Sequence, residues 1–168
     1  MRELHPVSSR HIISKSEKKR MLREIGERLP RSIKLLGEAR RLEIAKLRSG
    51  GRLILVEGVP AIFLGEYAYP TLLAAHKLGL KLPLVIVDMG AVPHILNGAD
   101  VMAPGIVEFE EFEEGEIVYV ADEEGKRVFA VGLTLVCSAK LREMKRGKVI
   151  KNLHYAGDKL WEVIRTIF

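Results

Sequence analysis

The sequence predicts an α+β fold in two domains, with a mixed α/β domain over residues 1–82 packed on a small, strand-rich barrel over residues 83–168. Apolar residues form 48% of the 168-residue chain, which is enough for a buried core without disulfide bonds. Helical and strand patterns mix in the first half, whereas short strand patterns dominate the second. The segment 80–83 is the best candidate for the boundary because it is short and apolar, and such a linker favours domains that pack together.

A capping box marks the first helix of the N-terminal domain. The Ser14 hydroxyl can accept a hydrogen bond from the amide three residues on, and the Glu17 side chain can reach back to the start of the helix. We therefore expect a helix over residues 16–28 that ends at Pro30. The other elements expected here are strands over 11–13 and 41–46, a hairpin of strands 52–56 and 61–64, and a helix over 69–78 with Pro70 in its first turn.

The second half alternates short strands with short helices. The expected strands cover 84–88, 100–102, 115–121, 127–136 and 149–155, and the expected helices cover 91–96, 138–144 and 159–167. Ser138 and Asp158 are predicted to cap the last two helices. We expect His154 to be packed and hydrogen-bonded, and Trp161 to lie in the core because its helix has an apolar pattern.

Charge is divided unevenly along the chain. Residues 1–52 hold 15 Lys and Arg against 6 Asp and Glu, whereas residues 53–168 hold 12 against 16. This asymmetry favours a polyanionic partner for the basic part, although an ordinary solvated surface explains it equally well. The exposed face of the first predicted helix offers a basic patch of Lys18, Lys19, Arg20 and Arg23.

Several classes of function lack support in the sequence. Cys137 is the single cysteine and has no obvious base near it, and the five histidines do not have the spacing of a helical zinc site. No phosphate-binding loop, dinucleotide fingerprint or catalytic triad is present. The longest apolar stretch, 128–137, is too short to span a bilayer. We therefore expect a cytoplasmic protein that is not an enzyme and that needs no cofactor or metal. The absence of Gln and the presence of only two Asn fit a thermophilic source.

The segment VDMGAVPHILNGADVMAPGI, residues 87–106, is the most informative part of the chain. It contains Gly90, Gly98 and Gly105, and glycine allows positive φ and a close approach of a nucleic-acid backbone. A helix starting at Ala91 would also offer free amides to a phosphate. The alternative is that these glycines only turn tight corners of a small barrel. Asp88 is expected to cap this helix or to order its amides and not to be catalytic, because no catalytic sequence surrounds it.

This segment resembles the first helix and second strand of PUA domains. Together with Asn152-Leu-His-Tyr155, Pro70-Thr-Leu-Leu and the run from His76 to Pro83, it resembles the malignant-T-cell-amplified-sequence and translation-machinery-associated proteins and their archaeal counterparts. The resemblance implies a pre-PUA domain packed on a PUA pseudo-barrel. It implies an RNA-binding surface over Gly90, Ala91, His94, Asn97, Gly98, Ala99, Asp100, Lys140, Lys148 and Lys151.

The chain departs from these relatives inside the motif. Met89 stands where relatives often place a lysine, and Pro93 and His94 replace a basic and an aromatic residue. The loss of positive charge should weaken the attraction of phosphate at this place.

The resemblance further implies an RNA-binding adaptor associated with translation. The RNA would be the tRNA acceptor or small-subunit ribosomal RNA, in initiation or recycling, with the small ribosomal subunit and an initiation-factor-like protein as partners. The alternative is an accessory subunit that delivers RNA to a tRNA- or rRNA-modifying enzyme.

Overall fold

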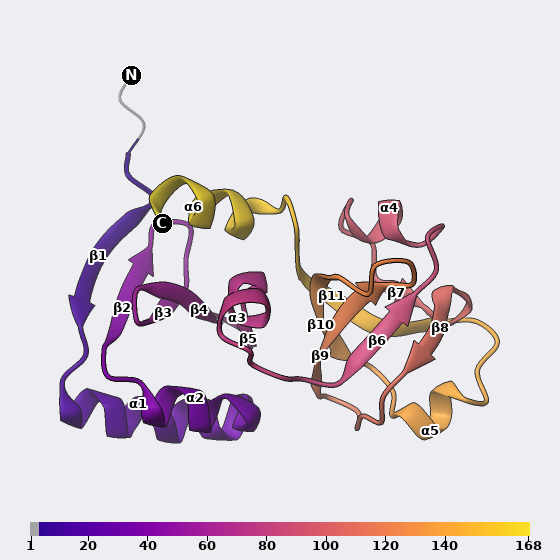
Figure 1. Cartoon of the computed structure of the whole chain (residues 1–168), viewed down its shortest axis with the longest axis horizontal. Helices are drawn as coiled ribbons and strands as arrows, with labels where there is room; N and C mark the ends of the chain where they lie inside the picture. The colour runs from indigo at the N-terminus through magenta and orange to yellow at the C-terminus, as the bar shows by residue number, and fades with distance from the viewer. Residues whose placement is uncertain (1–3) are drawn as a thin grey trace. The chain divides into compact units, whose positions relative to one another are not determined.

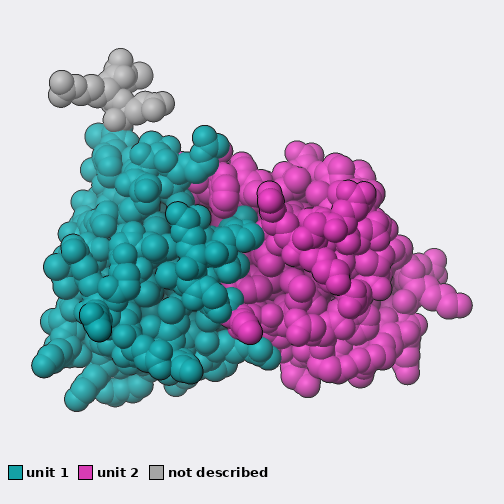
Figure 2. Space-filling view, viewed as in Figure 1, with its two compact units in different colours: residues 1–80, 163–168 teal, residues 81–162 magenta. Residues whose placement is uncertain are grey.

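The computed structural model describes residues 4–168, which form two compact units (Figure 2). The first unit comprises residues up to Leu80 together with Val163–Phe168, and the second comprises Lys81–Glu162. The last six residues therefore lie in the first unit, although we assigned the whole C-terminus to the second domain. The division of the chain into domains at 82/83 stays a prediction.

The first unit is built on an antiparallel five-stranded sheet with the strand order β1-β2-β3-β4-β5 (Figure 1). Its strands are β1 (Val7–Ile12), β2 (Leu42–Leu47), β3 (Arg52–Val56), β4 (Val59–Leu64) and β5 (Ala68–Pro70), and its helices are α1 (Lys15–Arg28), α2 (Ile33–Glu38) and α3 (Leu72–Lys77), with a 3-10 turn η1 (Pro30–Ser32) before α2. Ile25 of α1 and Leu36 of α2 are fully buried, as is Leu53 of β3. The last helix, α6 (Lys159–Ile167), adds its buried Ile164 to this unit.

The capping box of α1 is confirmed. The Ser14 amide donates to Glu17 Oε2 over 2.8 Å, and the Glu17 amide donates to Ser14 Oγ over 3.3 Å. The bond from the Ser14 amide, together with hydrogen bonds from the side chains of Ser14 and His11, lowers the pKa of the Glu17 carboxyl because these donors favour its charged form.

The predicted helix over 69–78 is too long at its N-terminal end. Pro70 ends the strand β5 and is not in a helical turn, and α3 starts only at Leu72. Thr71 is the N-cap because its Oγ1 accepts from the Ala74 amide over 3.3 Å, which satisfies a donor that the helix leaves free. We also missed α2, and the first strand is longer than predicted, since β1 covers Val7–Ile12.

The second unit holds a mixed six-stranded sheet with the order β7-β11-β10-β9-β6-β8, in which only the β6–β9 pair is parallel. The strands are β6 (Leu84–Val87), β7 (Val101–Met102), β8 (Ile106–Phe109), β9 (Ile117–Asp122), β10 (Val128–Thr134) and β11 (Lys148–Tyr155), and the helices are α4 (Val92–Ile95) and α5 (Ser138–Leu141). The 3-10 turn η2 (Ala103–Gly105) joins the two edge strands β7 and β8 directly. A connection of three residues brings the two edges together, so the sheet curls into the predicted barrel-like form.

Two predictions for this unit are wrong. Ser138 does not cap α5, because its Oγ accepts from the Phe112 amide over 3.1 Å and ties the helix to a distant segment. Trp161 is half-buried and not a core residue. The predicted set also lacked β8.

The end of β11 agrees with the sequence. His154 is fully buried, and its Nδ1 lies 2.8 Å from Asp158 Oδ2. Asp158 also accepts from the Trp161 amide over 2.8 Å, which confirms it as the cap of α6. Burial raises the pKa of the Asp158 carboxyl, but the His154 hydrogen bond and charge and the backbone amides outweigh it, so the net shift is downward.

No helix among residues 4–168 is long and apolar enough to cross a membrane.

Candidate nucleic-acid interface

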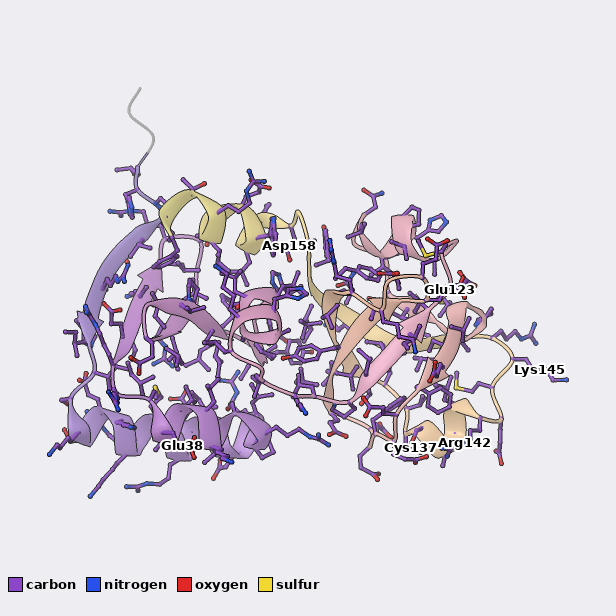
Figure 3. All side chains as sticks on the ribbon, in the orientation of Figure 1. Glu38, Glu123, Cys137, Arg142, Lys145 and Asp158 are labelled. Atoms are coloured by element: carbon purple, nitrogen blue, oxygen red, sulfur yellow. The ribbon has the colours of Figure 1, made fainter. Side chains whose placement is uncertain are left out.

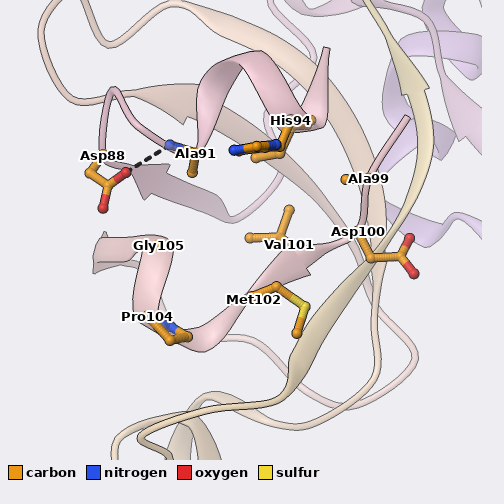
Figure 4. Close-up of a pocket in the computed structure, with 10 residues that line it drawn as sticks. Asp88, Ala91, His94, Ala99, Asp100, Val101, Met102, Pro104 and Gly105 are labelled. Atoms are coloured by element: carbon orange, nitrogen blue, oxygen red, sulfur yellow. Dashed lines mark hydrogen bonds between the residues drawn. The ribbon is translucent and has the colours of Figure 1, made fainter. Parts of the chain in front are cut away.

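A cavity of about 390 Å³ lies in the second unit, between α4, the start of β7 and the turn η2 (Figure 4). Its wall comes from one continuous part of the sequence, because the chain leaves β6, forms α4 and returns through β7. The residues that line it are Asp88, Ala91, His94, Ile95, Ala99, Asp100, Val101, Met102, Pro104 and Gly105. The motif singled out in the sequence thus forms a hollow and not only a series of turns.

The loop 95–100 is held in place by the last strand. Asn152 of β11 donates through Nδ2 to the Ile95 and Ala99 carbonyl oxygens, each over 3.0 Å. Its backbone amide donates to Asp100 Oδ1 over 2.9 Å. These three bonds fix both ends of the loop to β11, so the loop is held rigidly against this strand.

Gly98 has a structural reason to be glycine. Its φ of +95° lies in the left-handed region, which side chains other than glycine rarely adopt. A Cβ atom there would lie 3.4 Å from Tyr155 Oη, an ordinary contact distance, so the backbone conformation and not lack of space is what requires glycine.

Both carboxylate oxygens of Asp100 are engaged. Oδ1 accepts from the Asn152 amide, and Oδ2 lies 3.3 Å from Lys148 Nζ. The Asp100 carboxylate points away from the centre of the cavity (Figure 4). Asp100 therefore neutralises Lys148 and anchors the loop.

The Ala91 amide is not free for a phosphate, which corrects our expectation for that residue. The Ala91 amide donates to Asp88 Oδ1 over 2.8 Å (Figure 4), and the Met89 amide donates to Glu123 Oε1 over 3.2 Å. The expectation that Asp88 caps this helix or orders its amides is confirmed for the Ala91 amide. Glu123 comes from the β9–β10 turn, on the α4 side of the unit (Figure 3).

The ten residues predicted to contact RNA do not all come together. Four of them line the cavity: Ala91, His94, Ala99 and Asp100. Three others belong to the same segment of the chain: Gly90, Asn97 and Gly98. Lys148 forms an ion pair with Asp100, one of the lining residues. Lys140 is on α5, at the other end of the unit from α4 (Figure 1). Lys151 is an exposed residue of β11. The cavity thus receives fewer cations than the sequence suggested.

Sequence reasoning missed some residues of this site. Asp88, Val101, Met102, Pro104 and Gly105 belong to the motif, but their shared cavity could not be inferred from spacing. In the sequence, Asn152 belongs to the segment Asn152-Leu-His-Tyr155, which resembles PUA relatives, and no local pattern gives it a role. Its signal was its rarity, because it is one of two Asn in the chain.

The basic patch of α1 is only partly available. Lys18 Nζ donates to the carbonyl oxygens of Gly37 and Ala39, over 3.0 and 3.2 Å, so this lysine holds α1 against the end of α2. Lys19, Arg20 and Arg23 are exposed.

Net charge separates the two units. Residues 1–80 and 163–168 hold 17 Lys and Arg against 8 Asp and Glu, whereas residues 81–162 hold 10 against 14. The cavity therefore belongs to the acidic unit, and the basic patch belongs to the basic one. Among residues 4–168, no group of three or more His, Cys, Asp and Glu is arranged to hold a metal ion.

Comparison with known proteins assigns both units. Residues 83–156 match the model of the PUA domain, and residues 9–78 match that of a domain of unknown function, DUF1947. An uncharacterized protein of Methanocaldococcus jannaschii is 38% identical over 92% of this chain and 96% of its own length. Translation machinery-associated protein 20 of Schizosaccharomyces pombe is 35% identical, but the similarity spans only 56% of this chain and 55% of the yeast protein.

A solved structure extends the likeness to the fold. The crystal structure of a hypothetical protein from the hyperthermophilic archaeon Pyrococcus horikoshii is 35% identical and has a TM-score of 0.77. The match covers 93% of this chain and 99% of that one.

Proposed function

Because the chain belongs to the family of proteins in which a DUF1947 domain precedes a PUA domain, we propose that it is an RNA-binding adaptor associated with translation. The observation that carries the proposal is the PUA domain itself, with a cavity formed by its most specific segment. The translation-associated name of the yeast relative supports the process. On this proposal the protein acts in the cytoplasm and has no catalytic activity of its own.

The cavity favours single-stranded RNA over a duplex. Specific recognition of RNA usually targets unstacked bases of loops and ends, which can enter a hollow that a helix cannot. A cavity of about 390 Å³ has room for one nucleotide unit of such an end. The RNA would therefore be the tRNA acceptor end or an exposed strand of small-subunit ribosomal RNA, bound during initiation or recycling.

The α1 patch would add phosphate contacts of its own. Lys19, Arg20 and Arg23 are exposed, and each neutralised phosphate releases counterions, which adds affinity without sequence preference. The same basic unit would meet the small ribosomal subunit and an initiation-factor-like partner protein.

The proposal is tested by fluorescence anisotropy with labelled tRNA, with and without its single-stranded 3′ end, over a series of salt concentrations. Binding that depends on the 3′ end and exceeds binding to a DNA duplex supports it. Gly98→Val should weaken this binding because it strains the loop, whereas Lys140→Ala, at the other end of the unit, should not. Equal, salt-sensitive binding of all nucleic acids would reduce the function to general phosphate attraction.

A further inference from the structure

The cavity is unsuited to a phosphate. Among the described residues that line it there is no Lys or Arg, and Lys148 beside it is paired with Asp100. The amides of Ala91 and Met89, just before the first turn of α4, are already taken by the carboxylates of Asp88 and Glu123. A phosphate placed there would meet two negative charges and no free cation, so the cavity repels the group that RNA offers most often.

The cavity is instead suited to a flat, largely apolar group that donates hydrogen bonds. Ile95, Val101, Met102 and Pro104 supply apolar surface. The His94 ring projects into the cavity from α4 and offers a planar side (Figure 4). Aromatic, histidine and apolar side chains are the usual neighbours of an unstacked base.

Asp88 offers a hydrogen-bond acceptor to this lining. Asp88 Oδ1 is fixed by the Ala91 amide, which orients the carboxylate, and Asp88 Oδ2 has no hydrogen-bond partner among residues 4–168 (Figure 4). Asp100 cannot take this role, because both of its oxygens are engaged. A base that enters the cavity therefore meets a preoriented, negatively charged acceptor on one side.

We propose that this cavity holds a single unstacked nucleobase and selects it by an amino group that donates to Asp88 Oδ2. The inference rests on the proposed function and specifies its ligand. Cytosine, adenine and guanine carry an exocyclic amine, whereas uracil carries none. The N3–H donor of uracil lies between two carbonyl oxygens, which a carboxylate repels. Asp88 is thus a specificity-determining residue that discriminates against uracil.

The test compares labelled oligo(C) and oligo(U) of equal length, because the two bases have nearly the same size. Fluorescence anisotropy with the full chain should show oligo(C) bound about tenfold or more tightly, the range of a hydrogen bond to a charged group. Asp88→Asn keeps an oxygen for the Ala91 amide but replaces Oδ2 by an amide donor, so the preference should disappear or reverse. Glu143→Gln removes the same charge from an exposed residue that follows α5 and does not line the cavity, so it is the matched control and should leave the C-to-U ratio unchanged.

The possible outcomes separate this inference from the proposed function. A wild-type protein that binds oligo(C) and oligo(U) equally, or an Asp88→Asn variant that keeps the preference, overturns the role of Asp88 while RNA binding stands. Failure to bind any RNA overturns the proposed function. Cytidine and uridine, titrated separately into ¹⁵N-labelled protein, then test the cavity alone, and equal or absent shifts at Ala91 and His94 overturn the inference. If Asp88→Asn does not fold, Asp88→Ser replaces it, because serine can also accept from the Ala91 amide and lacks the second oxygen.

Discussion

Replacing Asn152 tests how the candidate RNA-binding loop is held. Its Nδ2 donates to two carbonyl oxygens of the loop, and each such bond contributes about 0.5–1.5 kcal/mol to stability. The Asn152 Oδ1 atom is buried with no hydrogen-bond partner among residues 4–168, so removing it recovers part of this loss. The Ile95 oxygen keeps its bond from the Gly98 amide. We therefore expect Asn152→Ala to lower the free energy of unfolding by about 1–2 kcal/mol.

The isosteric change Asn152→Asp should cost more than Asn152→Ala. It replaces the donor by a second carboxylate oxygen, which then faces two carbonyl oxygens at hydrogen-bonding distance. Urea unfolding measures both free energies, and hydrogen exchange of the amides of residues 96–100 measures whether the loop opens locally. Both variants should speed exchange in the loop before they affect β9 or β10. An Asn152→Asp variant as stable as the wild type would refute the described role of Asn152.

Three further changes test other parts of the structure. Because the pKa of the Asp158 carboxyl is lowered on folding, its charged form stabilises the fold above the unfolded-state pKa of about 4, and this contribution is lost as the pH falls through the folded-state pKa. Stability measured from pH 6 to pH 3 should therefore fall more steeply in the wild type than in Asp158→Asn; equal slopes would contradict the assignment. Gly132→Ala should destabilise the chain by about 1–3 kcal/mol in urea, because its Cβ would lie 2.7 Å from the Lys151 carbonyl oxygen, whereas Gly37→Ala has open space and should be neutral or stabilising. Ile164→Ala should cost about 2–4 kcal/mol and speed hydrogen exchange in α1–β5, because this buried residue belongs to the first unit; an effect confined to β6–β11 would contradict that placement.

Local rules predicted the features that depend on neighbouring residues. The capping box of Ser14 and Glu17, the cap at Asp158 and the bond from the Ala91 amide to Asp88 all join groups three residues apart. Such bonds depend on the backbone of one turn, so residue type and spacing are sufficient to infer them.

Features that depend on distant partners could not be predicted. Ser138 has the residue type of a cap, but its hydroxyl accepts a hydrogen bond from the amide of Phe112, which is 26 positions earlier. The strand β8 pairs with β6, although α4 and β7 lie between the two strands in the sequence. Its neighbouring residues Val107 and Glu108 are both exposed, so β8 lacks the alternating pattern of a half-buried strand.

The candidate site shows the same limit. The sequence located the motif 87–106, but it did not predict how little positive charge reaches the cavity. Lys140 lies at the far end of the unit, and Lys148 is paired with Asp100. Glu123, the acidic residue of the β9–β10 turn that accepts from the Met89 amide before α4, is 34 positions from Met89. A run of basic residues in a sequence indicates charge, and only the fold decides which cavity that charge reaches.

The most direct test of the central claim is a chemical-shift map of ¹⁵N-labelled protein titrated with an RNA that carries a single-stranded 3′ end. We expect the largest shifts on residues 88–105 and on Asn152, with a weaker, salt-sensitive set on α1. Shifts that are confined to α1, or that are spread over exposed basic residues without the loop 95–100, would contradict the claim that the PUA domain binds RNA through this cavity.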